Sequence, residues 1–200
     1  MAVTIVVIAA CTFAFLSTDV GQQALLDQQT RTLESFGIKL SDAQYAAMES
    51  RLQTTPYTTA AAQVVILPIA TLIVAAIGFA IFTAFLGGDA VFRQVFAVVA
   101  HSGVVLALQN VFSMPLDYVR ETFSSPTSLA VFAPFLDEAS FLGRMLGAID
   151  LFIVWWAVTL AIGLAVVYKR RTGPIAVAIL LLYAGIAVVL AAIRSALSGV

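Results

Sequence analysis

The side chains that could carry out chemistry are few, and they lie inside apolar stretches of the chain. His101, the only histidine, falls near the middle of the run 94–113, with Gln94 seven residues before it and Gln109 eight residues after it. This spacing places the three side chains on one face of a helix. Asp150 lies about one turn inside another apolar run. Ionisable side chains in a membrane span are costly and therefore mark candidate functional residues.

Two roles are open to Gln94, His101, Gln109 and Asp150. They could form a polar track that carries a proton, an ion or a small solute. Alternatively, they hydrogen-bond to neighbouring helices and fix the geometry of a bundle, for under about 2 kcal/mol each. We favour the structural role, because one histidine and one peripheral aspartate make a sparse proton relay.

Residue patterns typical of enzymes are absent from the sequence. There is no H-E-x-x-H, no G-x-S-x-G, no phosphate-binding P-loop and no dinucleotide-binding pattern. His101 and Asp150 alone would leave a tetrahedral metal site two ligands short. The single cysteine, Cys11, excludes an intramolecular disulfide, and a net charge of −1 does not supply the basic face that nucleic-acid binding needs. The sequence therefore predicts no catalytic activity, no cofactor and no nucleic-acid partner.

The elements that must position the polar residues are membrane spans. Hydrophobic residues make up 62% of the chain and charged residues 10%, whereas soluble domains are about 45–50% apolar and about 25% charged. Four runs reach the ~20 residues that cross a bilayer, and a fifth would extend only roughly 22 Å as a helix. We expect one all-α membrane domain over residues 1–200, a bundle of five transmembrane helices. The predicted spans are 2–16, 63–86, 94–113, 146–168 and 174–193.

The run 2–16 has three interpretations. A secretory signal peptide would need a basic start, but no Lys or Arg precedes Arg31. The stretch Ile8–Cys11 resembles a lipoprotein lipobox, although the apolar run continues beyond it to Leu16. We favour a transmembrane helix whose cytosolic entry is clipped.

The polar region 17–62 predicts a helical hairpin between the first two spans. Loosely helical apolar spacing over 20–36 predicts a helix that ends at Gly37. A second helix over 41–52 opens on the capping-box pattern Ser-x-x-Gln and is expected to end before Pro56. We interpret the pair as amphipathic helices on the membrane surface; the alternative is a solvated linker.

Basic residues set the predicted orientation. Lys169, Arg170 and Arg171 form the only basic cluster, which the positive-inside rule places in the cytoplasm. Six basic residues fall outside against four inside, but the inner ones are concentrated in short loops, and ten of the eleven acids fall outside. With five spans, the N-terminus is then cytoplasmic, and the hairpin 17–62, the loop 114–145 and the C-terminus are exoplasmic. Within that loop, the apolar segment 129–136 is too short to cross and is typical of an interfacial or re-entrant turn.

The run 148–167 carries the most recognisable pattern. Its D-L-F-x-x-W sequence, followed by Gly-Leu, a basic turn and a last apolar run, resembles the Yip domain family of polytopic membrane proteins. The stretch 92–101 also resembles the start of the third span of that family, so that the resemblance covers about residues 60–195. The matching residues are Asp150, Leu151, Phe152, Trp155, Gly163 and Leu164.

The resemblance implies five helices, a cytosolic N-terminus and an exoplasmic C-terminus. Eukaryotic members are similar to trafficking factors that engage prenylated Rab GTPases, but their Asp-Leu-Tyr-Gly-Pro signature is missing here. The chain is more similar to the bacterial branch, some of whose members accompany ABC-type exporters. We therefore expect a non-catalytic protein of the bacterial cytoplasmic (inner) membrane. Its expected partners are the lipid bilayer and other membrane proteins, an ABC-type exporter among them, or itself. The alternative is a small transporter or channel subunit that uses the polar track.

Overall fold

The computed structural model describes residues 1–85, 87–123, 125–137 and 140–198, and the regular elements of this part of the chain are all helices. An isolated antiparallel bridge joins Ser128 to Asp150. In chain order the elements are α1 (Ala2–Leu16), α2 (Asp19–Ser35), α3 (Asp42–Glu49), α4 (Thr55–Phe79), the π-helix η1 (Ala80–Phe85), α5 (Phe92–Ser102), α6 (Val104–Val119), the 3₁₀-helix η2 (Leu129–Phe132), α7 (Phe141–Gly147), α8 (Leu151–Val167) and α9 (Thr172–Ser198).

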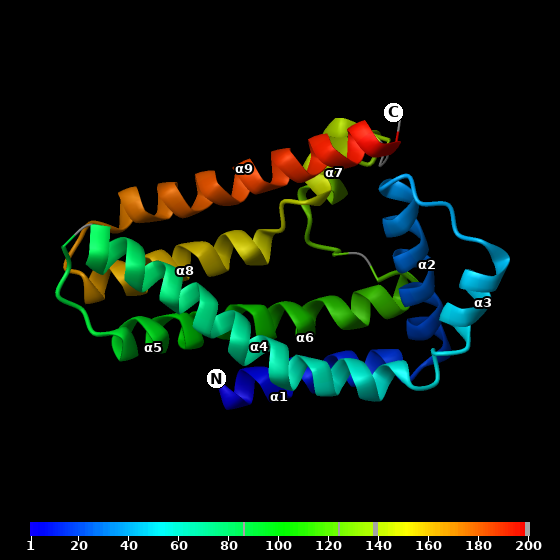
Figure 1. The fold of residues 1–200 in the computed structure, drawn as a ribbon, viewed down its shortest axis with the longest axis horizontal. Helices are drawn as coiled ribbons and strands as arrows, with labels where there is room; N and C mark the ends of the chain where they lie inside the picture. The colour runs from blue at the N-terminus through cyan, green and yellow to red at the C-terminus, as the bar shows by residue number, and fades with distance from the viewer. Residues whose placement is uncertain (86, 124, 138–139, 199–200) are drawn as a thin grey trace.

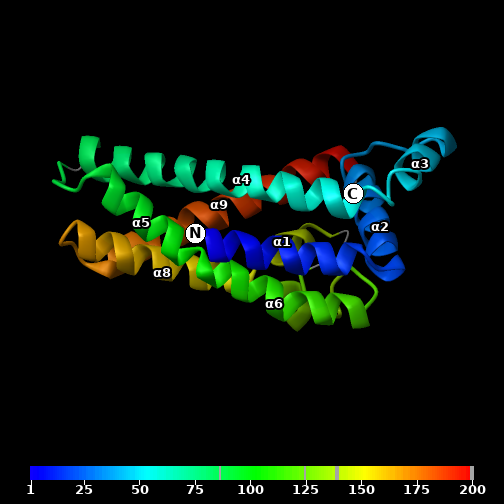
Figure 2. The same cartoon turned by 90° about the horizontal axis from the view of Figure 1, so that it is seen from below.

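The bundle is elongated, and α1, α4, α6, α8 and α9 run along its long axis (Figure 1). The chain bends by 97° between α1 and α2, so that α2 crosses one end of the bundle. At this bend the Thr18 hydroxyl accepts a hydrogen bond from the N–H of Gly21 at 3.0 Å. Figure 2 shows α3 beyond α2, at the same end.

Three helices are long and apolar enough to cross a membrane: Thr55–Thr83, Phe92–Val119 and Thr172–Leu197. The bent pair α1 and α2 would make a fourth if it counts as one span. The span predicted over 2–16 is α1, which has the predicted 15 residues, or roughly 22 Å. The span predicted over 146–168 is shorter than expected, because α8 has 17 residues, or roughly 26 Å. In agreement with the length of α1, the N-terminus lies part-way along the bundle in Figure 1.

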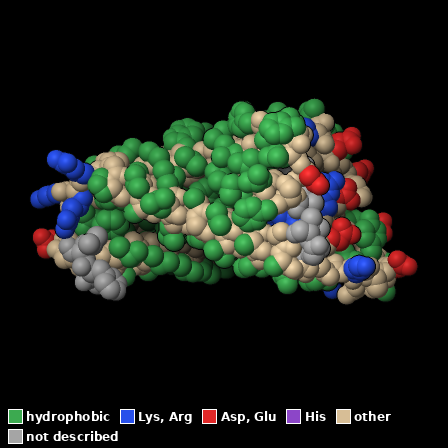
Figure 3. Space-filling view, turned by 90° about the horizontal axis from the view of Figure 1, so that it is seen from above, with side chains coloured by type: hydrophobic (Ala, Val, Ile, Leu, Met, Phe, Trp, Pro, Cys, Tyr) green, Lys and Arg blue, Asp and Glu red, His purple; other side chains and the backbone are tan. Residues whose placement is uncertain are grey.

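A broad apolar surface covers the middle of the molecule between two charged ends (Figure 3). Lys169, Arg170 and Arg171 are exposed in the turn between α8 and α9, at one of these ends. The segment from α2 to α3 and the end of α9 lie at the other end, whereas α8 begins part-way along the bundle, beside the middle of α9 (Figure 1). This distribution is the one expected of a bundle whose long axis crosses a bilayer.

The predicted boundaries of the long helices need three corrections. Helix α4 begins at Thr55 rather than at 63, with Pro56 in its first turn, where a missing N–H removes no helical hydrogen bond. Pro56 therefore starts a helix and does not merely end the preceding one. Helix α6 continues to Val119 instead of 113, which brings Asp117 out of the predicted loop and into a helix. The span predicted over 174–193 is extended at both ends by α9.

The predicted span 146–168 is two helices. Helix α7 ends at Gly147, and α8 begins at Leu151 with Asp150 as its N-cap. Asp150 therefore lies at the entry of a helix and not one turn inside it, as the sequence had indicated. An N-cap aspartate satisfies N–H groups of the first turn that have no partner within the helix, so that the chain breaks here at little cost.

The helical parts of the polar region 17–62 are confirmed. Helix α2 ends near Gly37, whose φ of 74° is readily adopted only by glycine. Helix α3 begins with the predicted capping box, in which Ser41 and Gln44 hydrogen-bond to each other's backbone N–H. It ends at Glu49 rather than at 52.

The main apolar core lies where α4, α5 and α8 meet. Ala75, Val95 and Ala161 are fully buried there. Helices α5 and α8 approach closely at Gly163, where an added Cβ would overlap the side chain of Val98. The glycine of the predicted pattern therefore sets the distance between two helices.

Candidate functional site

Asp150 is buried, with 4% of its surface exposed, and hydrogen-bond donors surround its carboxylate. Oδ1 accepts from the backbone N–H of Phe152 at 2.7 Å and of Ile153 at 3.3 Å, at the start of α8. Oδ2 accepts from the Thr127 hydroxyl at 2.7 Å and from the Ser125 hydroxyl. One carboxylate oxygen thus binds the start of α8, and the other binds a segment more than twenty residues earlier in the chain.

Tyr183 connects the same point to α9. Its hydroxyl accepts a hydrogen bond from the backbone N–H of Asp150 at 2.9 Å and donates one to the carbonyl oxygen of Ala148 at 2.7 Å. The one hydroxyl therefore satisfies a donor and an acceptor of the backbone that the break between α7 and α8 leaves outside any helix.

Backbone hydrogen bonds complete the cluster. The N–H of Leu129 donates to the carbonyl oxygen of Ile149 at 2.8 Å, and the N–H of Leu151 donates to that of Thr127 at 3.0 Å. We call Ser125, Thr127, Asp150 and Tyr183, with these two backbone pairs, the Asp150 cluster. It joins the loop after α6, the start of α8 and the middle of α9.

In the Asp150 cluster both oxygens of the carboxylate already have two donors each, an arrangement that suits a structural role. In the described residues, no group of three or more His, Cys, Asp or Glu side chains could hold a metal ion.

The other residues of the predicted family pattern pack around the start and middle of α8. The Phe152 ring lies 5.7 Å from the Phe112 ring of α6 and 5.8 Å from the Trp155 ring. Trp155 is 50% exposed and lies on the apolar part of α8. The pattern therefore describes a helix that is capped by Asp150 and packs through Phe152 and Gly163.

Hydrogen bonds in the described residues do not link the four side chains of the predicted polar track to one another. Gln94 accepts from the N–H of Val91 at 3.2 Å, and Nδ1 of the exposed His101 hydrogen-bonds to the carbonyl oxygen of Ala97 at 2.6 Å. Gln109 is half-buried on α6, beyond the break at residue 103. In the described part of the chain, no hydrogen bond joins any two of the four predicted side chains.

Two buried polar sites escaped the sequence analysis. The Gln63 amide of α4 donates to the Thr12 hydroxyl of α1 at 3.1 Å. Ser113 and Asp117 lie one turn apart on α6, both buried. The apolar run ends at 113, which places Asp117 in the predicted loop; helical spacing from Ser113 is the signal that the helix continues through it.

A cavity of about 1030 Å³ opens at the end of the bundle that holds α2, α7 and the end of α9. Ser125, Ser128 and Ala148 line it, so that it adjoins the Asp150 cluster. Sequence reasoning missed this cavity because its walls come from four separate regions of the chain. Its charged lining residues are Arg31, Glu34, Arg120, Glu121, Arg144 and Arg194.

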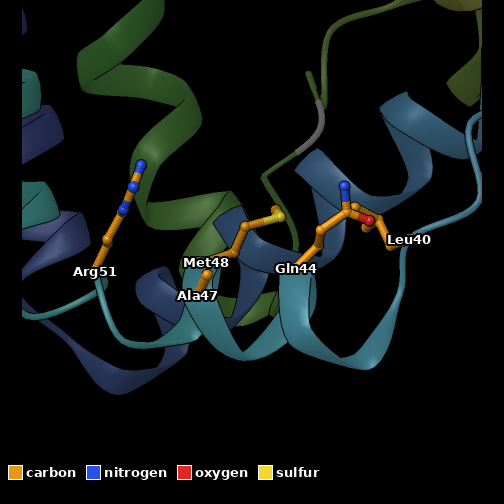
Figure 4. A pocket seen from close by; sticks show the side chains of 5 residues that line it. All are labelled: Leu40, Gln44, Ala47, Met48 and Arg51. Carbon is orange, nitrogen blue, oxygen red and sulfur yellow. The ribbon is translucent and has the colours of Figure 1, made fainter.

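A smaller cavity, of about 260 Å³, lies beside α3 (Figure 4). Helix α3 has no buried residue, and the cavity is a shallow feature between it and the turns that flank it. The lining residues are Leu40, Gln44, Ala47, Met48 and Arg51.

Fold and site together define an all-helical membrane protein with several candidate spans and a buried carboxylate that holds segments together. The chain belongs to the Yip1 domain family, because the model of that family matches residues 1–193. The resemblance predicted from the pattern around Asp150 is confirmed, and it extends to the N-terminal helices. No curated protein and no solved structure matches the chain.

Proposed function

We propose that this protein is a non-catalytic, multi-pass membrane protein that acts as an accessory or scaffolding partner of other membrane proteins. Export, trafficking and envelope assembly are the processes that such a partner would serve, and an ABC-type exporter is one partner of the expected kind. The observation that carries the proposal is the hydrogen bonding of Asp150. The ionisable residue of the family pattern has both oxygens bound by the protein itself.

The proposed topology has five passes in a bacterial inner membrane. Although α1 and α8 are short, both lie along the bundle axis beside the three longer helices (Figure 1). Chain direction supports this arrangement, because α4 runs away from the α2 end, α5 and α6 return, α8 runs away and α9 returns. The basic turn 169–171 is then cytoplasmic, and the α2–α3 hairpin, the loop 120–140 and the C-terminus are exoplasmic.

Helix α3 is the element that this function would use for a partner. It projects beyond α2 and has no buried residue, whereas the long helices pack on one another. Tyr45 is 37% exposed, and Met48 lines the small cavity beside the helix. A membrane protein with a segment on the same side of the bilayer could cover this surface.

A pull-down from native membranes in mild detergent tests the proposal. We expect mass spectrometry of the eluate to show another membrane protein in stoichiometric amount. The double variant Tyr45→Ser/Met48→Ser should lose that protein. The control Leu142→Ser, which replaces an exposed apolar residue of α7, should retain it. Recovery of the chain alone, or only as a homo-oligomer, would contradict the accessory role.

The transport alternative makes a different prediction for His101. If His101 carries protons or solute, His101→Ala should abolish flux into proteoliposomes and leave the fold intact. Under the accessory role it should change neither flux nor partner recovery, because the ring is exposed and bonds only to its own helix. Loss of a measurable flux on replacing His101 would overturn our assignment.

The topology has its own test. A cysteine introduced by Ser41→Cys, at the exposed start of α3, should react with an impermeant thiol reagent added to intact spheroplasts. Cys11 is half-buried in α1, so that a Cys11→Ala background removes its signal. Reaction only after the membrane is permeabilised would reverse the orientation.

A further inference from the structure

The large cavity beside α2 and α7 has the features of a site for a charged ligand at a membrane surface. Its volume of about 1030 Å³ is at the upper end of the ~300–1,000 Å³ of pockets for drug-sized ligands. We propose that it binds the phosphate-containing headgroup of an anionic phospholipid. This inference is independent of the accessory role, because it concerns a lipid and a different surface from α3.

The charges on the cavity wall favour an anion. Four arginines line it against two glutamates, so that the lining residues carry a net charge of +2. Arginine suits phosphate because its planar guanidinium has five N–H donors and can bind two oxygens at once. Arg194 already lies 5.2 Å from the centre of the Phe36 ring.

Hydroxyl groups extend the polar wall of the cavity. Ser125 and Ser128 line it together with Thr32 and Thr122. Thr32 donates to the carbonyl oxygen of Gln28 at 2.8 Å, and Ser125 donates to Asp150. The serine is thus oriented by the Asp150 cluster, which fixes one wall of the cavity in place.

Exposed apolar side chains beside the cavity point to a lipid and not to a soluble phosphate. Phe132 is 69% exposed and Phe135 is 83% exposed. They alternate along the chain with Val131, Pro134 and Leu136, which line the cavity. Large exposed phenylalanines are unfavourable in water and favourable in the acyl region of a bilayer. A headgroup held by the arginines would place its acyl chains against these rings.

The probe is the full chain in nanodiscs that contain phosphatidylglycerol and phosphatidylcholine in equal amounts. Native mass spectrometry of the released protein counts the lipids that stay bound. We expect phosphatidylglycerol to be retained in preference to phosphatidylcholine. A fluorescent phosphatidylglycerol, titrated into the detergent-purified protein, gives the affinity.

Arg31 and Arg120 are suitable for substitution, because both are exposed and line the cavity. The double variant Arg31→Gln/Arg120→Gln should weaken phosphatidylglycerol binding roughly 25-fold, since each basic residue near a membrane surface contributes about fivefold. The matched control Arg93→Gln/Arg171→Gln removes two exposed arginines from the opposite end and should leave the affinity unchanged. Phe135→Ser should weaken binding of the phospholipid but not of soluble glycerol phosphate. Thermal unfolding of each variant shows whether it is folded.

Three results would overturn the proposal. Equal retention of phosphatidylcholine would show that the charges do not select the lipid. Equal losses in the cavity variant and in the control variant would show a general charge effect instead of a site. Competition by soluble glycerol phosphate as strong as that by the phospholipid would assign the cavity to a soluble anion.

Discussion

Replacing Asp150 tests whether the Asp150 cluster holds the bundle together. Asp150→Ala removes the N-cap of α8, which costs about 1 kcal/mol. It also removes the charged acceptor, at 2.7 Å, of the buried Thr127 hydroxyl, which is 8% exposed, at about 1–3 kcal/mol; the neutral Ser125 hydroxyl, 3.0 Å away, remains as its partner. Ser125 is exposed and can turn to water. We therefore expect the free energy of unfolding to fall by about 2–4 kcal/mol.

Asp150→Asn should cost less than Asp150→Ala, at about 1 kcal/mol. The amide oxygen can still accept from the N–H groups of α8, but the amide NH₂ replaces an acceptor opposite the Thr127 hydroxyl. A larger loss of stability in Asp150→Ala than in Asp150→Asn is therefore as informative as either value. It separates loss of the cap and the hydroxyl partner from simple loss of charge.

Unfolding by SDS in mixed micelles, followed by far-ultraviolet circular dichroism, measures these differences. Asp89→Ala is the matched control, because Asp89 is exposed before α5, and it should change the stability by less than about 0.5 kcal/mol. A double-mutant cycle with Tyr183→Phe should show coupling, since both residues contact one backbone segment. Wild-type stability in Asp150→Ala, within about 0.5 kcal/mol, would refute the structural role of the carboxylate.

Three further substitutions are measured by the same unfolding assay. Gly163→Val should lower the free energy of unfolding by about 1–3 kcal/mol, because the added side chain overpacks against Val98. Val98→Ala in the same chain should restore part of the loss. An unchanged stability would mean that α5 and α8 separate freely. Gln63→Leu removes the hydrogen bond to Thr12, worth about 0.6 kcal/mol on average in a membrane, and also an amide oxygen that is buried without a partner. The free energy of unfolding of Gln63→Leu should therefore stay within about 1 kcal/mol of the wild-type value. A larger loss would indicate a partner for that oxygen. His101→Ala should cost less than about 0.5 kcal/mol because the ring is exposed, and a greater cost would place His101 in a packed interface.

The sequence predicts the long apolar helices well because the bilayer imposes one simple rule. Long apolar runs must be helical, since a helix satisfies its own backbone, and the runs around 63–86 and 174–193 became α4 and α9. The breaks were harder to predict. Hydropathy averages over a window, and one aspartate in a long apolar run does not lower the average enough to mark the end of a helix. Asp150 could have been read as an N-cap from its residue type alone.

The site was predictable only in part. The pattern around Asp150 pointed to the family and to that residue, but its hydroxyl partners lie 23 to 33 residues away along the chain. Such pairings depend on how the loop after α6 folds back, which helical periodicity does not specify. The arginine-lined cavity was hidden for the same reason, because Arg31 and Arg194 meet only through the 97° turn that carries α2 across the bundle end.

The position of Tyr183 in the middle of α9 also has a consequence for motion. Sliding α9 along α8 by one turn would move the tyrosine hydroxyl by about 5.4 Å. The N–H of Asp150 and the carbonyl of Ala148, now at 2.9 and 2.7 Å from that hydroxyl, would lose it together. The two hydrogen bonds therefore oppose sliding of α9 along α8. A relative movement of α5 and α6 at their break, at Gly103, would leave this register intact.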